Sequence, residues 1–285
     1  MDVSGKTVAL TGAASGIGRA LALELASRGC ALALSDNNTE GLRETQDLVK
    51  AASPDCVISL HSVDVADLDQ VNSWAESAVT HHSHIDILIN NAGVAASGAI
   101  DDITVEEFNW VFNILFYGVL YGTKAFLPHL KTRPQAHIVN ISSVNGFFPF
   151  PGNASYACGK HAVKAFSQTL MQELDGSSIN VSSVHPGGIK TNIVNSSRYF
   201  GHQFSDSFRR QAGEEFTRLA KTTPEKAAKV IVAGIEKNKK RVLVGVDAYI
   251  LDMLNRIFPQ AFSNFIGRWV IKHRSALEEQ SAKTS

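Results

Sequence analysis

Three residues near the middle of the chain could together move a proton: Ser143, Tyr156 and Lys160. Tyr156 and Lys160 are four residues apart, so on a helix they lie on one face, one turn apart. A tyrosine phenol has an ordinary pKa of about 10 and is a poor acid or base at neutral pH. A lysine ammonium beside it favours the phenolate and lowers that pKa. We therefore predict that Tyr156 transfers a proton and that Lys160 tunes it.

Ser143 follows an apolar run, residues 136–141, that is typical of a buried strand. A hydroxyl at the end of such a strand can donate a hydrogen bond to a substrate oxygen. A tyrosine and a lysine at this spacing are weak evidence by themselves, because a surface tyrosine beside a solvated lysine is the commoner arrangement. Whether these three residues form a catalytic site therefore depends on the elements that surround them.

A glycine-rich turn lies between a β-rich run at residues 6–10 and an amphipathic helical pattern at 19–28. Its spacing, from Thr11 to Gly18, is G-x-x-x-G-x-G rather than the more usual G-x-G-x-x-G. In this strand–turn–helix context, backbone N–H groups can approach a pyrophosphate at the helix N-terminus. The turn therefore predicts a dinucleotide site.

Asp36 ends the second predicted strand, at the offset from the glycine turn expected for a carboxylate that binds ribose. Such a carboxylate accepts a hydrogen bond from the 2′-hydroxyl of NAD and repels the 2′-phosphate of NADP. The alternative role, capping the helix that starts at Thr39, is compatible with the first. No basic residue stands at positions 13, 14 or 37, and Arg19 is the nearest cation. We predict NAD as the cofactor, with NADP less favoured.

Strand and helix patterns alternate along residues 6–245, and this alternation predicts an α/β fold. Specifically, we expect a Rossmann-like, doubly wound parallel sheet of about seven strands, with helices on both faces and a C-terminal helical extension. The expected strands are residues 6–10, 31–35, 57–60, 85–89, 136–141, 179–184 and 241–244. The expected helices are residues 19–28, 39–52, 66–81, 104–127, 153–174 and 224–238. Residues 1–246 would form the dinucleotide-binding and catalytic domain, and 247–285 an amphipathic extension of it.

The helix predicted at 104–127 is apolar nearly all round and is expected to be buried in the domain or against another subunit. Asn113 is the conspicuous polar residue inside it. A buried asparagine needs hydrogen-bond partners, so Asn113 is either structural or holds a water at a site.

Composition excludes several classes of function. The formal net charge is zero and the pI is about 7.2, so no basic surface for nucleic acid is expected. The three cysteines form no disulfide or zinc pattern, and the chain begins without a secretory signal pattern, so we expect a reducing, cytoplasmic location. The histidines at 81, 82 and 84 lack further ligands, and no metal site is expected.

Taken together, these motifs resemble the short-chain dehydrogenase/reductase family in its single-domain form. The matching residues follow the family's order and spacing over residues 6–191: the turn at 11–18, Asp64-Val65, Asn90-Asn91-Ala92-Gly93, Asn113, Ser143, Tyr156, Lys160, Pro186-Gly187 and Thr191. The seventh strand extends the match to about residue 245.

The resemblance implies a role for each matching residue. Tyr156 would be the general acid/base, Lys160 would lower its pKa and bind the nicotinamide ribose, Ser143 would bind the reacting oxygen, and Asn113 would support a proton-relay water. The implied cofactor-binding residues are Gly12, Ser15, Gly16, Ile17, Gly18, Asp36, Asp64, Val65, Asn91, Ala92, Gly93, Tyr156, Lys160, Pro186, Gly187, Ile189 and Thr191.

The implied reaction is hydride transfer between nicotinamide and a secondary alcohol or ketone, in a homodimer or homotetramer. The phenylalanines after Thr191, at 200, 204, 208 and 216, favour a bulky apolar substrate over a sugar. Two alternatives stay open: a non-catalytic dinucleotide-binding sensor on the same fold, and a membrane-surface dehydrogenase of lipid-like substrates.

Residues 247–273 carry an amphipathic helical pattern interrupted by Pro259. Its apolar face could pack on the enzyme or a neighbouring subunit and roof the substrate pocket, or it could lie on a bilayer. We favour packing on protein, which is the commoner fate of such a stripe, and because Asp247 and Asp252 suit an anionic surface poorly. Deleting 247–285 should then lower stability or change the oligomeric state and weaken binding of bulky substrates.

Overall fold

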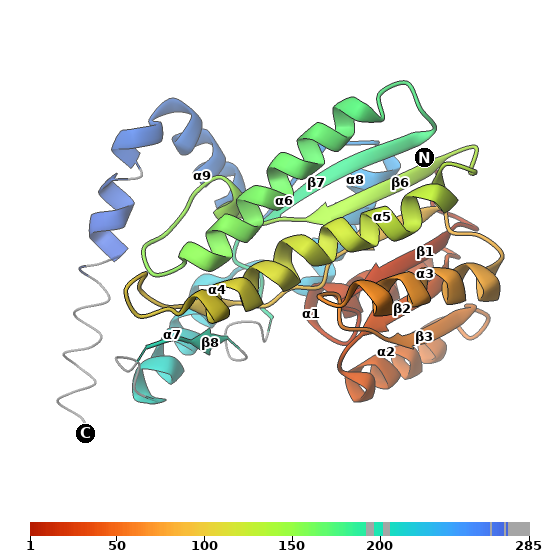
Figure 1. Cartoon of the computed structure of the whole chain (residues 1–285), viewed down its shortest axis with the longest axis horizontal. Helices are drawn as coiled ribbons and strands as arrows, with labels where there is room; N and C mark the ends of the chain where they lie inside the picture. The colour runs from red at the N-terminus through yellow and green to blue at the C-terminus, as the bar shows by residue number, and fades with distance from the viewer. Residues whose placement is uncertain (192–196, 202–205, 263, 271, 273–285) are drawn as a thin grey trace.

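A parallel sheet of seven strands runs through the molecule, with helices on both faces (Figure 1). The computed structural model describes residues 1–191, 197–201, 206–262, 264–270 and 272. The strand order is β3-β2-β1-β4-β6-β7-β9. The strands of this sheet are Thr7–Thr11 (β1), Ala31–Asp36 (β2), Ile58–Ser62 (β3), Ile87–Asn90 (β4), Ala136–Ile141 (β6), Ile179–Pro186 (β7) and Arg241–Val244 (β9). The predicted doubly wound fold is confirmed.

Helices follow the strands much as the sequence predicts. They are Gly16–Ser27 (α1), Thr39–Ala52 (α2), Leu68–His82 (α3), Val105–Phe112 (α4), Gly118–Leu130 (α5), Ala154–Glu173 (α6), Asp206–Leu219 (α7), Pro224–Glu236 (α8) and Val246–Ile257 (α9). Two features differ from expectation. The single helix predicted at 104–127 contains a π-helical turn, η1 (Asn113–Tyr117), between α4 and α5, and α7 forms in a stretch that shows no clear helical pattern.

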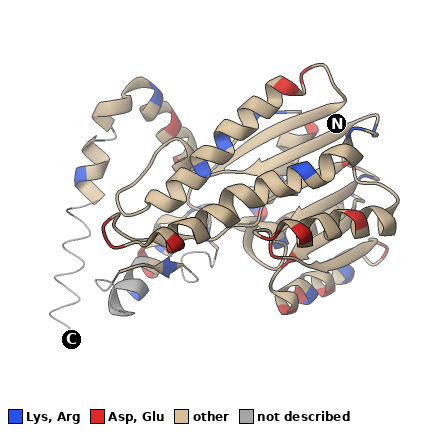
Figure 2. Cartoon of the chain, viewed as in Figure 1, with Lys and Arg blue, Asp and Glu red and all other residues tan. Residues whose placement is uncertain are grey.

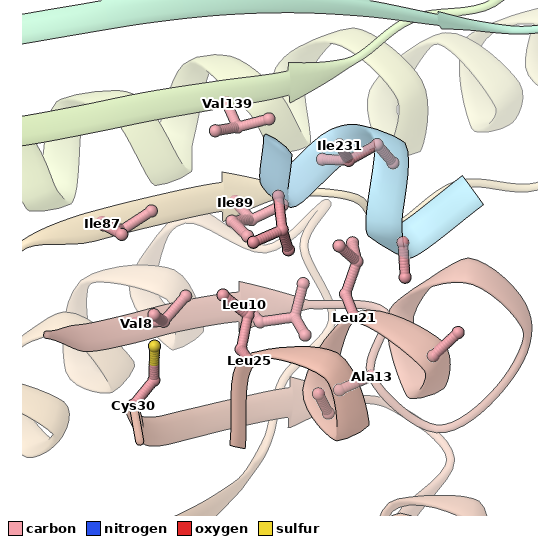
Figure 3. Close-up of a cluster of buried hydrophobic side chains, with 14 of the residues drawn as sticks. Val8, Leu10, Ala13, Leu21, Leu25, Cys30, Ile87, Ile89, Val139 and Ile231 are labelled. Atoms are coloured by element: carbon pink, nitrogen blue, oxygen red, sulfur yellow. The ribbon is translucent and has the colours of Figure 1, made fainter. Parts of the chain in front are cut away.

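Alternation along each strand places the core on both faces of the sheet. Val8 and Leu10 of β1 pack with the apolar sides of α1, α2 and α8 in one cluster, and Figure 3 shows them beside Leu21 of α1 and Ile231 of α8. Ala9 points to the other face, where it joins side chains of α3, α5 and α6. Strands buried on both faces in this way read as continuous apolar runs.

The order of the strands creates a crevice. From β1 the chain continues outward through β2 and β3, and then returns to place β4 on the other side of β1. In open α/β sheets, ligands bind outside the carboxyl ends of the strands at such a switch point. A small second sheet also forms, in which β5 (Ala96–Ser97) pairs in parallel with β8 (Arg198–Tyr199).

The combined helix Val105–Leu130 is long and apolar enough to cross a membrane, judged by length and composition only. A core helix of a globular protein meets the same criterion. In this fold the helix contacts α3, α6 and β4 as one layer over the sheet.

Candidate active site

A cavity of about 850 Å³ lies at the carboxyl ends of the strands. It extends from the turn between β1 and α1, past the end of β2, to the start of α6 and to α9. Every site residue predicted from the sequence lines this cavity except Asn113. Segments spread over most of the chain therefore meet at one site.

The three proton-transfer candidates come from two neighbouring elements. Ser143 follows β6 and precedes the short 3-10 helix η2 (Val144–Gly146), and its Oγ accepts a hydrogen bond from the Asn145 N–H at 3.1 Å. Tyr156 and Lys160 are one turn apart on α6, as predicted. The Ser142 hydroxyl donates to the Lys160 carbonyl at 2.8 Å and so ties α6 to the end of β6.

Burial controls the charge states of these side chains. The Lys160 side chain is buried, and its Nζ donates to the Ile141 carbonyl at 2.8 Å. This burial lowers the pKa of Lys160 to about 8, so at neutral pH the ammonium form still predominates. Burial also raises the pKa of Tyr156, and the neighbouring Ser143 hydroxyl opposes that rise only in part.

The prediction that Lys160 lowers the pKa of Tyr156 is therefore wrong for this structure. The Lys160 Nζ lies 5.9 Å from the centroid of the Tyr156 ring, and its hydrogen bond goes to the backbone of β6 instead. Loss of hydration disfavours the phenolate, and it is the main cause of the raised pKa of Tyr156.

Asn113 is a second correction. The sequence predicts a buried asparagine near Lys160, but Asn113 is exposed and does not line the cavity. Two positions along a helix turn a side chain by about 200°, and it is Leu115 that faces inward from η1. Leu115 packs so closely against the strand end that a Cβ on Gly93 would lie 3.1 Å from its Cδ2. The apolar residue takes the buried side, so the proton-relay role of Asn113 is not supported.

The glycine turn is held by the neighbouring strand. The Asn91 side chain donates to the carbonyls of Thr11, at 2.9 Å, and Gly12, at 3.1 Å. The Thr11 hydroxyl in turn accepts from the N–H groups of Asn91 and Ala92. Gly12 has φ of +67°, and a Cβ there would lie 2.7 Å from the Ala92 Cα. Only glycine fits at this position.

The N-terminus of α1 is suited to an anion. Its N-cap residue, Ser15, makes no side-chain capping bond, and Gly16 and Ile17 in the first turn line the cavity. N–H groups in the first turn of a helix lack partners within the helix and carry partial positive charge. These residues fit the pyrophosphate of a dinucleotide.

Asp36 lies where β2 meets the cavity. Its carboxylate accepts from the N–H groups of Ala14 and Asn38, each at 2.9 Å. Arg19 does not neutralise it, because its guanidinium donates to Glu44 at 2.7 Å and to the carbonyl of Ala14 at 2.6 Å. The nearest cation is therefore already paired.

Asp247 is a cavity residue that sequence reasoning missed. It lies in the first turn of α9, and its Oδ2 accepts from the Gly188 N–H at 2.6 Å. A Cβ on Gly187 would collide with this carboxylate. The segment from Pro186 to Thr191 is thus fastened to a helix about sixty residues further along the chain. An acid in the first turn of a helix is common, so no local signal distinguishes this one.

The far end of the cavity combines apolar and polar side chains. Its lining there comes from separate parts of the chain: Ser97, Asn145, Phe150, Asn153, Tyr199, Phe216, Leu219 and Leu251. Of the phenylalanines predicted to shape a substrate pocket, Phe216 lines the wall and Phe200 is buried beside Ala96. The side chains of Phe204 and Phe208 lie outside the described residues.

Comparison with known proteins agrees with this geometry. Residues 6–200 match the family model for short chain dehydrogenases. The oxidoreductase SadH of Mycobacterium tuberculosis is 39% identical over 272 residues, which cover 94% of this chain and 96% of SadH. The chain belongs to the short-chain dehydrogenase/reductase family.

Solved structures of the family superpose on most of the chain. A short-chain dehydrogenase/reductase from Burkholderia phymatum in complex with NAD has a TM-score of 0.80 at 27% identity, covering 90% of this chain and 94% of its own. One from Mycobacterium paratuberculosis bound to NAD has a TM-score of 0.73 at 28% identity, covering 86% and 97%. Within the described residues, no group of three or more His, Cys, Asp or Glu is arranged to hold a metal ion.

Proposed function

We propose that this short-chain dehydrogenase/reductase transfers a hydride between NAD and a bulky, apolar secondary alcohol or ketone. The observation that carries the proposal is the presence of Ser143, Tyr156 and Lys160 in the same cavity as the glycine turn and Asp36. A non-catalytic sensor would need only the last two features. The full set favours an enzyme over the sensor.

Tyr156, Ser143 and Lys160 would each have a separate role in the reaction. In ketone reduction, the Tyr156 phenol would donate its proton to the carbonyl oxygen, and in alcohol oxidation the Tyr156 phenolate would take up the hydroxyl proton of the substrate. The Ser143 Oγ donates a hydrogen bond to that same oxygen. The nicotinamide supplies or accepts the hydride when the cofactor is bound. Lys160, whose ammonium lies at the end of β6, would bind the ribose hydroxyls and hold positive charge beside Tyr156.

Two observations support NAD over NADP. Asp36 places a carboxylate at the cavity wall beside the glycine turn, where it would repel a 2′-phosphate. Arg19, the nearest cation, is held by Glu44 and by two backbone carbonyls, so it is not free to bind a phosphate. The relatives solved with NAD agree with this choice.

The substrate class is inferred from the wall opposite the glycine turn. Phe150, Phe216, Leu219 and Leu251 present apolar surface there. Ser97, Asn145, Asn153 and Tyr199 add polar groups, but the four apolar side chains favour a bulky apolar substrate over a polyol. Assembly as a homodimer or homotetramer and a cytoplasmic location stay predictions.

The proposal is tested by assaying purified protein on steroids, retinoids, long-chain secondary alcohols and polyols, each with NAD and with NADP. Formation of reduced nicotinamide is the readout. We expect the highest kcat/KM for an apolar secondary alcohol with NAD. Preference for polyols would overturn the substrate class, and preference for NADP would overturn the cofactor. Tight NAD binding without turnover of any compound would favour the sensor.

A further inference from the structure

The C-terminal helical segment exposes a large apolar surface. This segment comprises α9 and the helical residues 259–262, 264–270 and 272, which follow a bend at Phe258. In Figure 1 it lies at the edge of the molecule, far from β1, β2 and β3. The large apolar side chains exposed on it, here called the apolar patch, are Val246, Tyr249, Ile250, Met253, Ile257, Phe258, Phe265 and Trp269. Contiguous apolar surface of this kind marks an interaction site.

The opposite face of the same segment is already used. Ala248 is fully buried, and Leu251, Phe262 and Ile266 pack against Phe148 and its neighbours near η2. The rings of Phe148 and Phe262 have their centroids 4.9 Å apart. This packing holds the segment against the enzyme and directs the apolar patch outward. The expected packing on protein is thus found, but it accounts for only one of two apolar faces.

The two acids of the segment already have hydrogen-bonding or ion-pair partners within the enzyme. Asp247 accepts from Gly188 at 2.6 Å, and Asp252 is only 13% exposed and pairs with Arg241 at 2.5 Å and Arg256 at 3.1 Å. From the sequence, these two carboxylates argued against binding to an anionic bilayer. In the structure, both interact with other groups of the enzyme. Asp247 is exposed but lines the cavity, and Asp252 is paired with two arginines.

The remaining charges on the segment are basic. Arg268 and Lys272 are exposed, and no ion pair joins either of them to a carboxylate of the described residues. The whole chain has zero formal net charge, so this local excess is not a general property of the surface. In Figure 2 the segment is mostly uncharged, with basic residues at intervals. Apolar side chains bordered by cations suit a surface of anionic phospholipids.

We propose that the apolar patch docks on an anionic phospholipid bilayer, with Arg268 and Lys272 near the headgroups. Tyrosine and tryptophan, both present in the patch, are enriched at membrane interfaces. A symmetric contact through the apolar patch offers no carboxylate of the patch to these cations, whereas anionic lipid neutralises them. Leu251 lines the cavity from the inner face of α9, so the docked enzyme would open its apolar end near the membrane.

The test uses the full-length protein and sedimentation with vesicles. The vesicles are phosphatidylcholine alone or phosphatidylcholine with a minority of phosphatidylglycerol. We expect binding to the anionic vesicles, weakened by added salt because surface charges are screened. The triple variant Ile250→Ser/Ile257→Ser/Phe265→Ser should bind at least about tenfold more weakly, since apolar burial drives insertion. Arg268→Glu/Lys272→Glu should lose the preference for anionic lipid.

The matched control is Val57→Ser/Leu68→Ser, which removes two exposed apolar side chains near β3 at the opposite edge of the sheet. It should bind vesicles like the parent protein. Thermal melting and mass in solution are measured for every variant, and the substituted residues are exposed, so the fold should persist. These readouts require no catalysis and are independent of the proposed activity.

Three results would overturn the docking proposal. The first is failure of the parent protein to sediment with anionic vesicles. The second is equal binding by the triple variant and the parent. The third is a parent protein that does not bind vesicles, together with a triple variant of smaller mass in solution. This result would mean that the patch binds a second copy of the chain.

Discussion

The cofactor end of the cavity is closed by hydrogen bonds between adjacent strand ends, whereas the substrate end is closed by apolar side chains from distant segments. At the first end, Asn91 and Thr11 join β4 to the glycine turn, and Asp36 joins β2 to it. At the second, Phe150, Phe216 and Leu251 come from three parts of the chain and offer only apolar side chains to a ligand. The cofactor end therefore recognises its ligand by hydrogen-bond donors and acceptors in fixed positions. The substrate end recognises its ligand by shape.

Because of this difference, the two ends of the cavity discriminate between ligands in different ways. Hydrogen-bonded groups in a fixed geometry reject a ligand that leaves them unpaired, whereas an apolar wall discriminates weakly between ligands of similar size. We therefore expect single substitutions at the cofactor end to change the choice of cofactor sharply. Substitutions at the substrate end should change affinity gradually over a series of compounds.

Tyr156→Phe should have the largest effect, because Tyr156 lies where the two ends meet. Removal of the phenol oxygen should lower kcat by about 10³-fold, since general acid–base catalysis contributes about 10²- to 10⁴-fold. Cofactor affinity should stay within a small factor of the parent, as measured by fluorescence titration. Tyr121→Phe on α5, outside the cavity, is the matched control. Turnover by Tyr156→Phe within tenfold of the parent would contradict the assignment.

Asp36→Ala should have the next largest effect and should act on the cofactor alone. Loss of the carboxylate removes the repulsion of a 2′-phosphate, so the kcat/KM ratio of NAD to NADP should fall by about 10- to 100-fold. Asp67→Ala, which removes the carboxylate that caps α3, should leave the ratio unchanged. Glu44→Gln sharpens the test, because it releases Arg19 and should raise activity with NADP. An unaltered ratio in Asp36→Ala would remove Asp36 from the selectivity argument.

The same difference explains how much could be predicted from the sequence. The fold and the cofactor end follow from local patterns: alternating strands and helices, a glycine turn, and an acid at the end of β2. Asp247 could not be found this way, because its partner Gly188 is 59 residues away. Asn113 was misplaced, because a helical pattern that is apolar on nearly every side does not reveal which residue of η1 faces inward. The pKa of Tyr156 depends on burial, which the spacing of Tyr156 and Lys160 does not show.

Asp247→Ala tests whether the C-terminal helix supports the cofactor end from outside. Loss of the bond to Gly188 should loosen the segment that follows β7 and raise KM for the cofactor by about tenfold, the value expected for one charge-assisted hydrogen bond. Asp247→Asn keeps an oxygen acceptor and should restore most of the affinity. Asp252→Ala, on the same helix but paired with Arg241 and Arg256, should lower stability without changing KM. Equal effects of Asp247→Ala and Asp252→Ala on KM would mean that α9 acts only through stability.

The smallest expected effect is on the pH dependence of folding stability, which reflects the buried histidines of the fold. Burial lowers the pKa of His61, His82 and His185 to about 4, and that of His137 to about 3. In the unfolded chain these imidazoles return to a pKa of about 6.5. Between these values the unfolded chain binds more protons than the folded one, so stability rises with pH in this window. The stability that these neutral histidines contribute is fully present above about pH 6.5 and declines as the pH falls towards 4.

The measurement is the urea midpoint at several pH values through that window. His137→Gln should make the decline shallower, because His137 of β6 is fully buried and its ring contacts Ser182 of β7 at 2.8 Å. His185 adds a link to the site, since its Nδ1 lies 3.1 Å from the Ser143 carbonyl; charging this imidazole should disturb Ser143 before the sheet unfolds. Activity should therefore be lost at a higher pH than the folded signal, and coincident losses would show that His185 has no separate effect on the site.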